Sequence, residues 1–128
     1  MLRPYLVDTD VFIDYLRGFP QAVAFVKAKS SRIITSSIVV AELYAGVQGE
    51  EEEVTLDSLI SLFQVIPVSP ELAKQGGFYR HDYGKSHNVG LADAIIAATA
   101  TGLDAELKTL NTRHYPMFKG LRPAYRKT

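Results

Sequence analysis

Short apolar runs alternate with longer helix-like segments along this chain, and that alternation is the strongest constraint on its fold. Buried strands separated by helices form parallel sheets, because each crossover helix covers one face of the sheet. The chain therefore predicts a three-layer α/β/α domain with a central parallel sheet of four or five strands. The expected strands are residues 4–8, 32–35, 64–68 and 105–109, with a fifth short strand near Leu121.

The helices are indicated by apolar spacing and by residues that favour helix ends. Pro20 and Pro70 suit first turns, and Ser36 or Ser37 suits a cap. The pair Gly76-Gly77 predicts a break or weak point in the helix that begins at Pro70. The expected helices are residues 11–16, 20–27, 37–46, 50–63, 70–83 and 91–101.

Length and composition point to one ordinary domain covering residues 1–128. The absence of cysteine excludes disulfides and thiolate zinc sites, and suits a reducing cytosol. No apolar stretch approaches the roughly 18 residues of a spanning helix. Asp8 and Asp10 follow Arg3 too closely for a secretory signal. We therefore expect a cytoplasmic protein without a membrane partner.

Three acidic residues stand inside apolar segments. Asp8 closes the first strand, Glu42 lies within the helix-like stretch 37–46, and Asp93 opens an alanine-rich helix. Sites in parallel sheets form outside the carboxyl ends of the strands. We expect Asp8 at such an end, and Glu42 and Asp93 near helix starts at the same rim. Embedded charges need partners, so the three acids predict a shared cation.

The available ligands favour a hard divalent cation. Two carboxylates about 4 Å apart repel by roughly 4 kcal/mol at an effective dielectric of 20, and a cation would relieve that repulsion. With no thiols, oxygen ligands favour Mg²⁺ or Mn²⁺, which activate water and hold phosphate oxygens. Each acid also has an ordinary reading: Asp8 as a helix cap, Glu42 on an exposed face, Asp93 as a first-turn residue.

The carboxyl-terminal end of the chain is basic, although the net charge is zero. Zero net charge argues against a protein that coats polyanions generally, whereas a basic end allows local contact with a nucleic acid backbone. A solvated tail is the alternative interpretation. The basic residues that follow Glu106, with no acid among them, are Lys108, Arg113, Lys119, Arg122, Arg126 and Lys127.

Four segments together resemble the PIN-domain ribonucleases, in the family's order and spacing. They are Leu6–Gly18, Ser36–Gly46, Leu91–Ala100 and Thr109–Phe118. The length, without a further domain, is similar to that of the VapC-type toxins of prokaryotic toxin–antitoxin pairs.

The resemblance implies a Mg²⁺- or Mn²⁺-dependent endoribonuclease, the toxin of a type II toxin–antitoxin module, that hydrolyses RNA with a metal-activated water. It implies a cognate VapB-like antitoxin and, by analogy, a homodimer. The implied catalytic metal ligands are Asp8, Glu42 and Asp93, with Asn111 and Asp10 as further candidates. The implied hydroxyl groups near the ion are those of Thr9, Ser36 and Thr109, and the implied RNA contacts are Arg113 and Lys119.

One position departs from the family pattern. Asn111 stands where many members have aspartate, and an amide brings no negative charge. The sequence therefore leaves open whether the site holds one metal ion or two. Asp14, on the first helix, is expected to be solvated.

Parts of the sequence are compatible with three other kinds of protein. Asp8-Thr-Asp10 resembles the start of haloacid-dehalogenase-like phosphatases, but Phe12 departs from that motif and Glu42 has no role in it. A receiver domain needs an acid after the third strand, where Ser69 stands. A PIN-like fold kept only for binding a partner would be compatible with the missing fourth acid.

Overall fold

The computed structural model describes residues 2–127. Four strands of this part of the chain form one sheet. All strands run parallel, in the spatial order β3-β2-β1-β4. The strands are β1 (Tyr5–Val7), β2 (Ile33–Ser36), β3 (Gln64–Ile66) and β4 (Glu106–Lys108).

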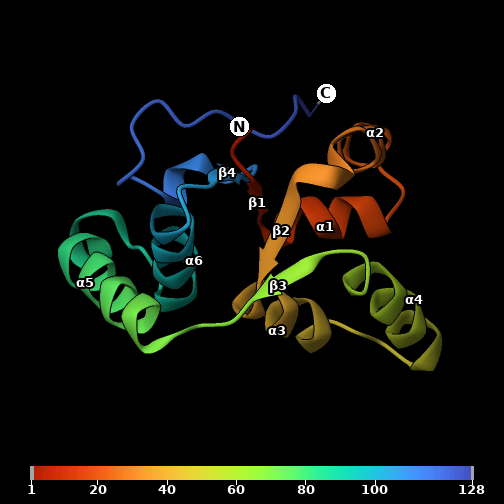
Figure 1. Cartoon of the computed structure of the whole chain (residues 1–128), viewed down its shortest axis with the longest axis horizontal. Helices are drawn as coiled ribbons and strands as arrows, with labels where there is room; N and C mark the ends of the chain where they lie inside the picture. The colour runs from red at the N-terminus through yellow and green to blue at the C-terminus, as the bar shows by residue number, and fades with distance from the viewer. Residues whose placement is uncertain (1, 128) are drawn as a thin grey trace.

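Six α-helices flank the sheet. Figure 1 shows α5 and α6 on one side, and α1, α2 and α4 on the other. The three-layer α/β/α architecture expected from the sequence is therefore confirmed. The helices are α1 (Thr9–Leu16), α2 (Pro20–Lys29), α3 (Ser37–Ala45), α4 (Glu50–Ile60), α5 (Pro70–His87) and α6 (Leu91–Gly102), with short 3₁₀ turns η1 (Ser30–Arg32) and η2 (Thr112–His114).

The fifth strand expected near Leu121 is absent from residues 2–127, so that prediction was wrong. The N–H of Ala124 donates to the carbonyl of Thr109 at 2.9 Å. Pro123 has no N–H with which to extend that bond into a ladder. Apolar residues in this segment, including Leu121, pack against the core in irregular structure instead.

The parallel arrangement brings three polar residues to one edge of the sheet. Asp8 follows β1, Ser36 ends β2 and Thr109 follows β4. β1 lies between β2 and β4, with Tyr5 in register with Ile33 on one side and Glu106 on the other. All carboxyl ends meet at the same rim, where ligand sites form in such sheets.

Two of these rim residues also start helices. Asp8 caps α1, its Oδ1 accepting from the N–H of Thr9 at 2.8 Å. Ser36 caps α3, its Oγ accepting from the N–H of Ile38 at 3.1 Å. Side-chain acceptors satisfy N–H groups that have no partner in the first helical turn, so the rim residues fix where these helices begin.

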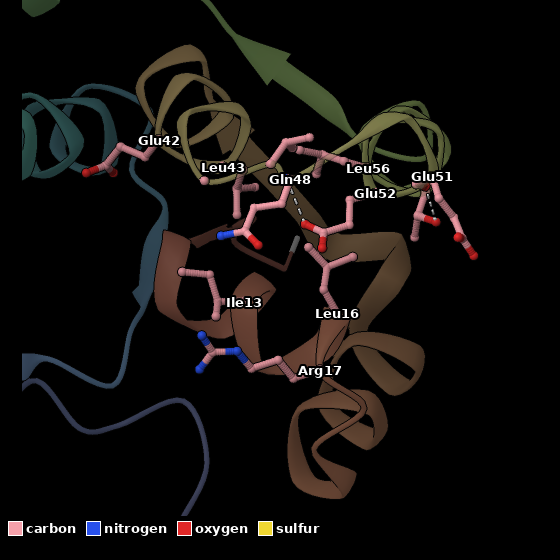
Figure 2. A pocket seen from close by; sticks show the side chains of 12 residues that line it. Ile13, Leu16, Arg17, Glu42, Leu43, Gln48, Glu51, Glu52 and Leu56 are labelled. Atoms are coloured by element: carbon pink, nitrogen blue, oxygen red, sulfur yellow. Dashed lines mark hydrogen bonds between the residues drawn. The ribbon is translucent and has the colours of Figure 1, made fainter.

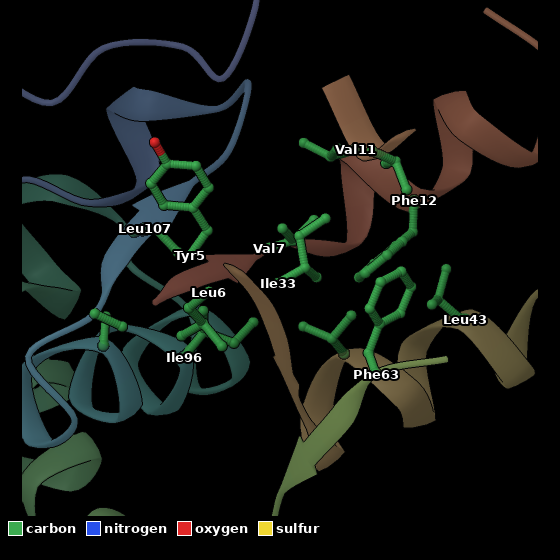
Figure 3. Packing of buried hydrophobic residues seen from close by; sticks show 14 of the residues in the cluster. Tyr5, Leu6, Val7, Val11, Phe12, Ile33, Leu43, Phe63, Ile96 and Leu107 are labelled. Atoms are coloured by element: carbon green, nitrogen blue, oxygen red, sulfur yellow. The ribbon is translucent and has the colours of Figure 1, made fainter. Parts of the chain in front are cut away.

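The hydrophobic core lies between the sheet and its helices. Leu6 and Val7 of β1 are fully buried, as is Ile96 of α6. Figure 3 shows the side chains of Phe12 and Phe63 next to each other. Their ring centroids lie 5.7 Å apart and the ring planes are tilted by 42°. Packing on both faces of β1 makes it the most constrained strand and holds Asp8 in place at its end.

Asp14 is buried in α1, so the expectation of a solvated side chain was wrong. Its carboxylate accepts from the hydroxyl of Tyr125 at 2.7 Å and from Nζ of Lys127 at 3.2 Å. Burial alone would raise the pKa of Asp14, but these bonds and nearby positive charges lower it below its ordinary value. Asp14 thus anchors the carboxyl-terminal segment to the first helix.

Within residues 2–127, no helix is both long and apolar enough to cross a membrane.

The break expected in α5 at Gly76-Gly77 does not occur, and the helix is continuous from Pro70 to His87. A Cβ on Gly76 would lie 2.7 Å from Cγ1 and 3.0 Å from Cα of Ile95 on α6, whereas one on Gly77 would meet nothing within 4 Å. Gly76 therefore permits the close approach of α5 and α6 seen in Figure 1.

These two glycines give opposite predictions for the same substitution. Gly77→Ala should stabilise the protein by about 0.5–1 kcal/mol, because alanine favours the helix and restricts the unfolded chain. Gly76→Ala should destabilise it by about 1–3 kcal/mol, because the new methyl group collides with Ile95. Urea denaturation of both variants measures the difference; equal effects would contradict the close packing described here.

Candidate active site

Asp8 is the centre of the polar cluster at the sheet rim. Its side chain is buried, at 6% exposure. Besides the helix-cap bond to Oδ1, its Oδ2 accepts from Oγ1 of Thr109 at 2.9 Å and from the hydroxyl of Tyr115 at 2.7 Å. Donors from α1, from the end of β4 and from the segment after η2 thus converge on one carboxylate.

Asp93 lies beside Asp8 in the first turn of α6. Its Oδ1 is 3.3 Å from the hydroxyl of Tyr115, and its Oδ2 is 3.2 Å from Nδ1 of His114. The two partners are adjacent in the chain at the end of η2, so this turn holds both oxygens of Asp93.

Glu42 joins the cluster through Thr9. The Thr9 hydroxyl donates to Oε1 of Glu42 at 2.7 Å. The expectation that Glu42 lies near a helix start was wrong: it stands in the second turn of α3 and is exposed. It reaches the site because α3 packs against α1, which begins at Thr9.

Asp10 holds the loop between β4 and η2 in place. Its Oδ2 accepts from the backbone N–H groups of Leu110 and Asn111, at 2.9 Å and 3.2 Å. It also lies 3.2 Å from Oγ1 of Thr109, whose single proton is nearer to Asp8. The Asn111 backbone is therefore fixed by Asp10. Asn111 itself is exposed, and its side chain makes none of the hydrogen bonds that hold the acids.

The cluster gathers several acidic side chains whose negative charges repel one another. Burial raises the pKa of Asp93 above its ordinary value, and the negative charge of Asp8 raises it further, although His114 partly offsets this. Burial and then the charge of Asp8 also raise the pKa of Asp10. Although Glu42 is exposed as a residue, partial desolvation of its carboxylate raises its pKa; the hydrogen bond from Thr9 lowers the pKa, and the charges of Asp8 and Asp93 raise it. These like charges favour protonation or a bound cation.

The donor set suits a hard cation, since the acids and the hydroxyls beside them offer only oxygen. The carboxylates are joined through Thr9 and Tyr115 rather than gathered around one point. Within residues 2–127, no three acidic or histidine side chains are arranged to hold a metal ion together. The chemistry of the residues therefore fits a divalent cation. The carboxylates would have to move closer together to bind one ion in common.

The other sequence candidates fall outside this network. Ser36 is buried and caps α3, without a hydrogen bond to any of the acids. Arg113 and Lys119 are exposed. Arg113 also lines a shallow hollow with His87 and Phe118, next to η2.

Tyr115 and His114 were not assigned to the site from the sequence. No local pattern places them beside Asp93, because the Tyr115–Asp93 contact spans 22 residues. The only signal was their position inside the Thr109–Phe118 segment.

A groove of about 740 Å³ opens beside Glu42, between α1, α3 and α4. Figure 2 shows Ile13, Leu16, Leu43 and Leu56 around it, with Glu42 at one end. Acidic residues of α4 lie at the other end, where Oε1 of Glu52 accepts from the N–H of Gln48 at 3.0 Å. The groove is therefore lined by apolar side chains interspersed with polar ones, among them Arg17 and Gln48, and it has carboxylates at both ends.

Comparisons with known proteins cover nearly the whole chain. A family model described as PIN domain matches residues 5–117. The chain is 38% identical over 124 residues to Ribonuclease VapC19 of Mycobacterium tuberculosis, covering 94% of this chain and 98% of that protein. It is 39% identical over 124 residues to Ribonuclease VapC10 of the same species, covering 94% and 92%. A chain of a solved toxin–antitoxin complex from Klebsiella pneumoniae is similar with a TM-score of 0.82 and 28% identity, covering 96% of this chain and 99% of that chain.

The raised pKa of Asp93 predicts a pH-dependent loss of stability. Folding makes this carboxyl hold its proton more tightly, so its contribution to the free energy of unfolding is complete below the unfolded pKa, near 4, and falls as pH rises through the folded value. In chelator, Asp93→Asn should therefore become more stable relative to the wild type as pH rises. Urea denaturation at several pH values measures this.

Asp82→Asn is the control, because Asp82 is an exposed carboxyl on α5. A difference between wild type and Asp93→Asn that stays constant with pH would contradict the electrostatic reading.

Proposed function

The chain belongs to the PIN-domain family, and from this membership we propose that it is a metal-dependent endoribonuclease, the toxin of a type II toxin–antitoxin module. The observation that carries the chemistry is the buried Asp8, with Asp93 and Glu42 beside it at the carboxyl rim of the sheet. A phosphatase that uses Asp8 as a covalent nucleophile fits poorly, because it gives no role to Glu42, which joins the cluster through Thr9.

Asp8, Glu42 and Asp93 are the residues that would hold Mg²⁺ or Mn²⁺. The ion would supply charge stabilisation at the phosphate and an activated water. Thr9 and Thr109 orient the carboxylates through the hydrogen bonds described above.

The remaining candidates receive supporting roles. Asp10 fixes the loop before η2, since its Oδ2 already accepts from two backbone N–H groups. Because Asn111 adds no negative charge, we propose that the site binds one metal ion. Arg113 and Lys119 would contact RNA phosphates from the exposed surface near η2. A homodimer stays a prediction.

RNA cleavage by the purified protein tests this function. Chelation with EDTA should stop cleavage of transfer or ribosomal RNA, and Mg²⁺ or Mn²⁺ should restore it. Asp8→Asn should lower the cleavage rate by about 100-fold or more, because the cation that would stabilise the developing charge loses an anionic ligand. A time course of substrate loss gives the rate of cleavage, and sequencing of RNA ends gives its position.

Asp82→Asn provides the matched control for this test and should cleave at the wild-type rate. Cleavage that continues unchanged in EDTA, or in Asp8→Asn, would overturn the proposal.

The groove beside Glu42 is the proposed binding site for an antitoxin segment. Its apolar floor, formed by residues such as Leu16 and Leu43, suits a peptide with apolar side chains. Glu42 at one end suits a basic residue of that peptide. Such a residue would lie against the carboxylate cluster, so binding in the groove would also block the site.

Substitution in the groove tests this arrangement. Leu16→Glu replaces an apolar side chain of the groove by a charged one and should weaken antitoxin binding by at least about 10-fold, because the charge would lose hydration under the bound peptide. Co-purification and calorimetry with the antitoxin measure the binding, and RNA cleavage should persist. Leu103→Glu is the control, since Leu103 and Leu16 are similarly exposed, at 40% and 38%. Equal loss of binding in both variants would contradict the assignment.

A further inference from the structure

The hydroxyl of Tyr115 lies between two carboxylates that belong to different elements. It is 2.7 Å from Oδ2 of Asp8, at the end of β1, and 3.3 Å from Oδ1 of Asp93, in α6. The ring is 1% exposed and stacks on Phe118, with centroids 6.5 Å apart and an interplanar angle of 24°. The hydroxyl is therefore held at one place by packing.

We propose that Tyr115 is a positioning residue of the carboxylate site, whose hydroxyl sets the separation and orientation of Asp8 and Asp93 before a divalent cation binds. The inference rests on the proposed function, since it assigns the cation to these two acids. It concerns how this chain prepares the site, and it makes a claim about cation affinity that is independent of RNA cleavage.

Electrostatic repulsion is the reason such a bridge is needed. Two ionised carboxylates near each other tend to move apart or to take up a proton. A hydroxyl has one proton, so the shorter contact shows that Tyr115 donates chiefly to Asp8 and reaches Asp93 more weakly. A tyrosine hydroxyl ordinarily keeps its proton near neutral pH, so Tyr115 is a donor there.

The bond also selects an oxygen of Asp8. Oδ2 receives two side-chain hydroxyls, from Tyr115 and Thr109, whereas Oδ1 receives the backbone N–H of Thr9. Each carboxylate oxygen has two lone pairs. Oδ1 therefore keeps more acceptor capacity for a cation, and Tyr115 helps to fix the carboxylate in that orientation.

The chain contains a matched control for the hydroxyl. Tyr125 donates to Oδ2 of Asp14 at 2.7 Å, the same distance as the Tyr115–Asp8 bond, but at the far end of α1. Tyr115→Phe and Tyr125→Phe each remove one hydroxyl and keep the ring. The two variants differ in whether the carboxylate that loses its donor belongs to the cluster.

The test measures Mn²⁺ affinity by calorimetry and by the Mn²⁺-dependent rise in Tm, together with kcat and KM for RNA cleavage. Tyr115→Phe should bind Mn²⁺ about 10–100-fold more weakly, as expected when a group that orients a metal ligand is lost. Its kcat should fall at limiting Mn²⁺ and recover at high Mn²⁺, with KM little changed. Tyr125→Phe should keep wild-type Mn²⁺ affinity even if its Tm falls.

The outcomes separate this inference from the proposed function. Unchanged Mn²⁺ affinity in Tyr115→Phe, or equal losses in both variants, overturns the positioning role. Absence of Mn²⁺ binding by the wild type overturns it as well.

Wild-type protein that binds Mn²⁺ without cleaving RNA overturns the nuclease function alone, and the affinities then decide the role of Tyr115. If Tyr115→Phe does not fold, Thr109→Val removes the other hydroxyl on Oδ2 and should weaken Mn²⁺ binding in the same range.

Discussion

The hydrogen bonding of the buried Asp8 carboxylate is the constraint on which the site depends. A charge at the end of a central strand is unfavourable unless donors compensate for its lost hydration. The donors are the backbone of Thr9 and the hydroxyls of Thr109 and Tyr115, which come from separate parts of the chain. The site is therefore complete only when α1, β4 and the segment after η2 are all in place.

This construction places like charges together at some expense of stability. The pKa values of Asp10 and Asp93 are raised largely by burial and by Asp8, which shows that the acids oppose one another in the folded protein. Such local instability is common where a site is prepared for a ligand. A cation that binds the folded state would return part of that free energy.

Glu42 connects the chemistry with the surface. It is the exposed member of the acid cluster and also lines the groove between α1, α3 and α4. Its hydrogen bond to Thr9 ties it to the helix that Asp8 caps. A partner bound in the groove would thus meet the same carboxylate that the proposed reaction uses, which gives a direct physical route from binding to inhibition.

The sequence predicted the features that depend on local pattern. The apolar runs gave the four strands, and the helix starts at Pro20 and Pro70 were right because proline suits a first turn. The errors arose where distant contacts override local preference. The glycine pair in α5 allows packing on Ile95 instead of breaking the helix, and Asp14 is buried because Tyr125 and Lys127 reach it across the molecule.

By itself the sequence determined the alternating elements, the parallel sheet and the acids expected at its rim, since periodicity and end signals act within a few residues. The tertiary structure decided how those acids are held. Tyr115 and His114 contact Asp93 only because η2 folds back beside α6. Asp10 holds the loop before η2 by accepting from backbone N–H groups, and a sequence pattern does not predict such bonds. Hydrogen bonds between residues far apart in the chain depend on the packed arrangement of the elements, and that arrangement is a property of the whole fold.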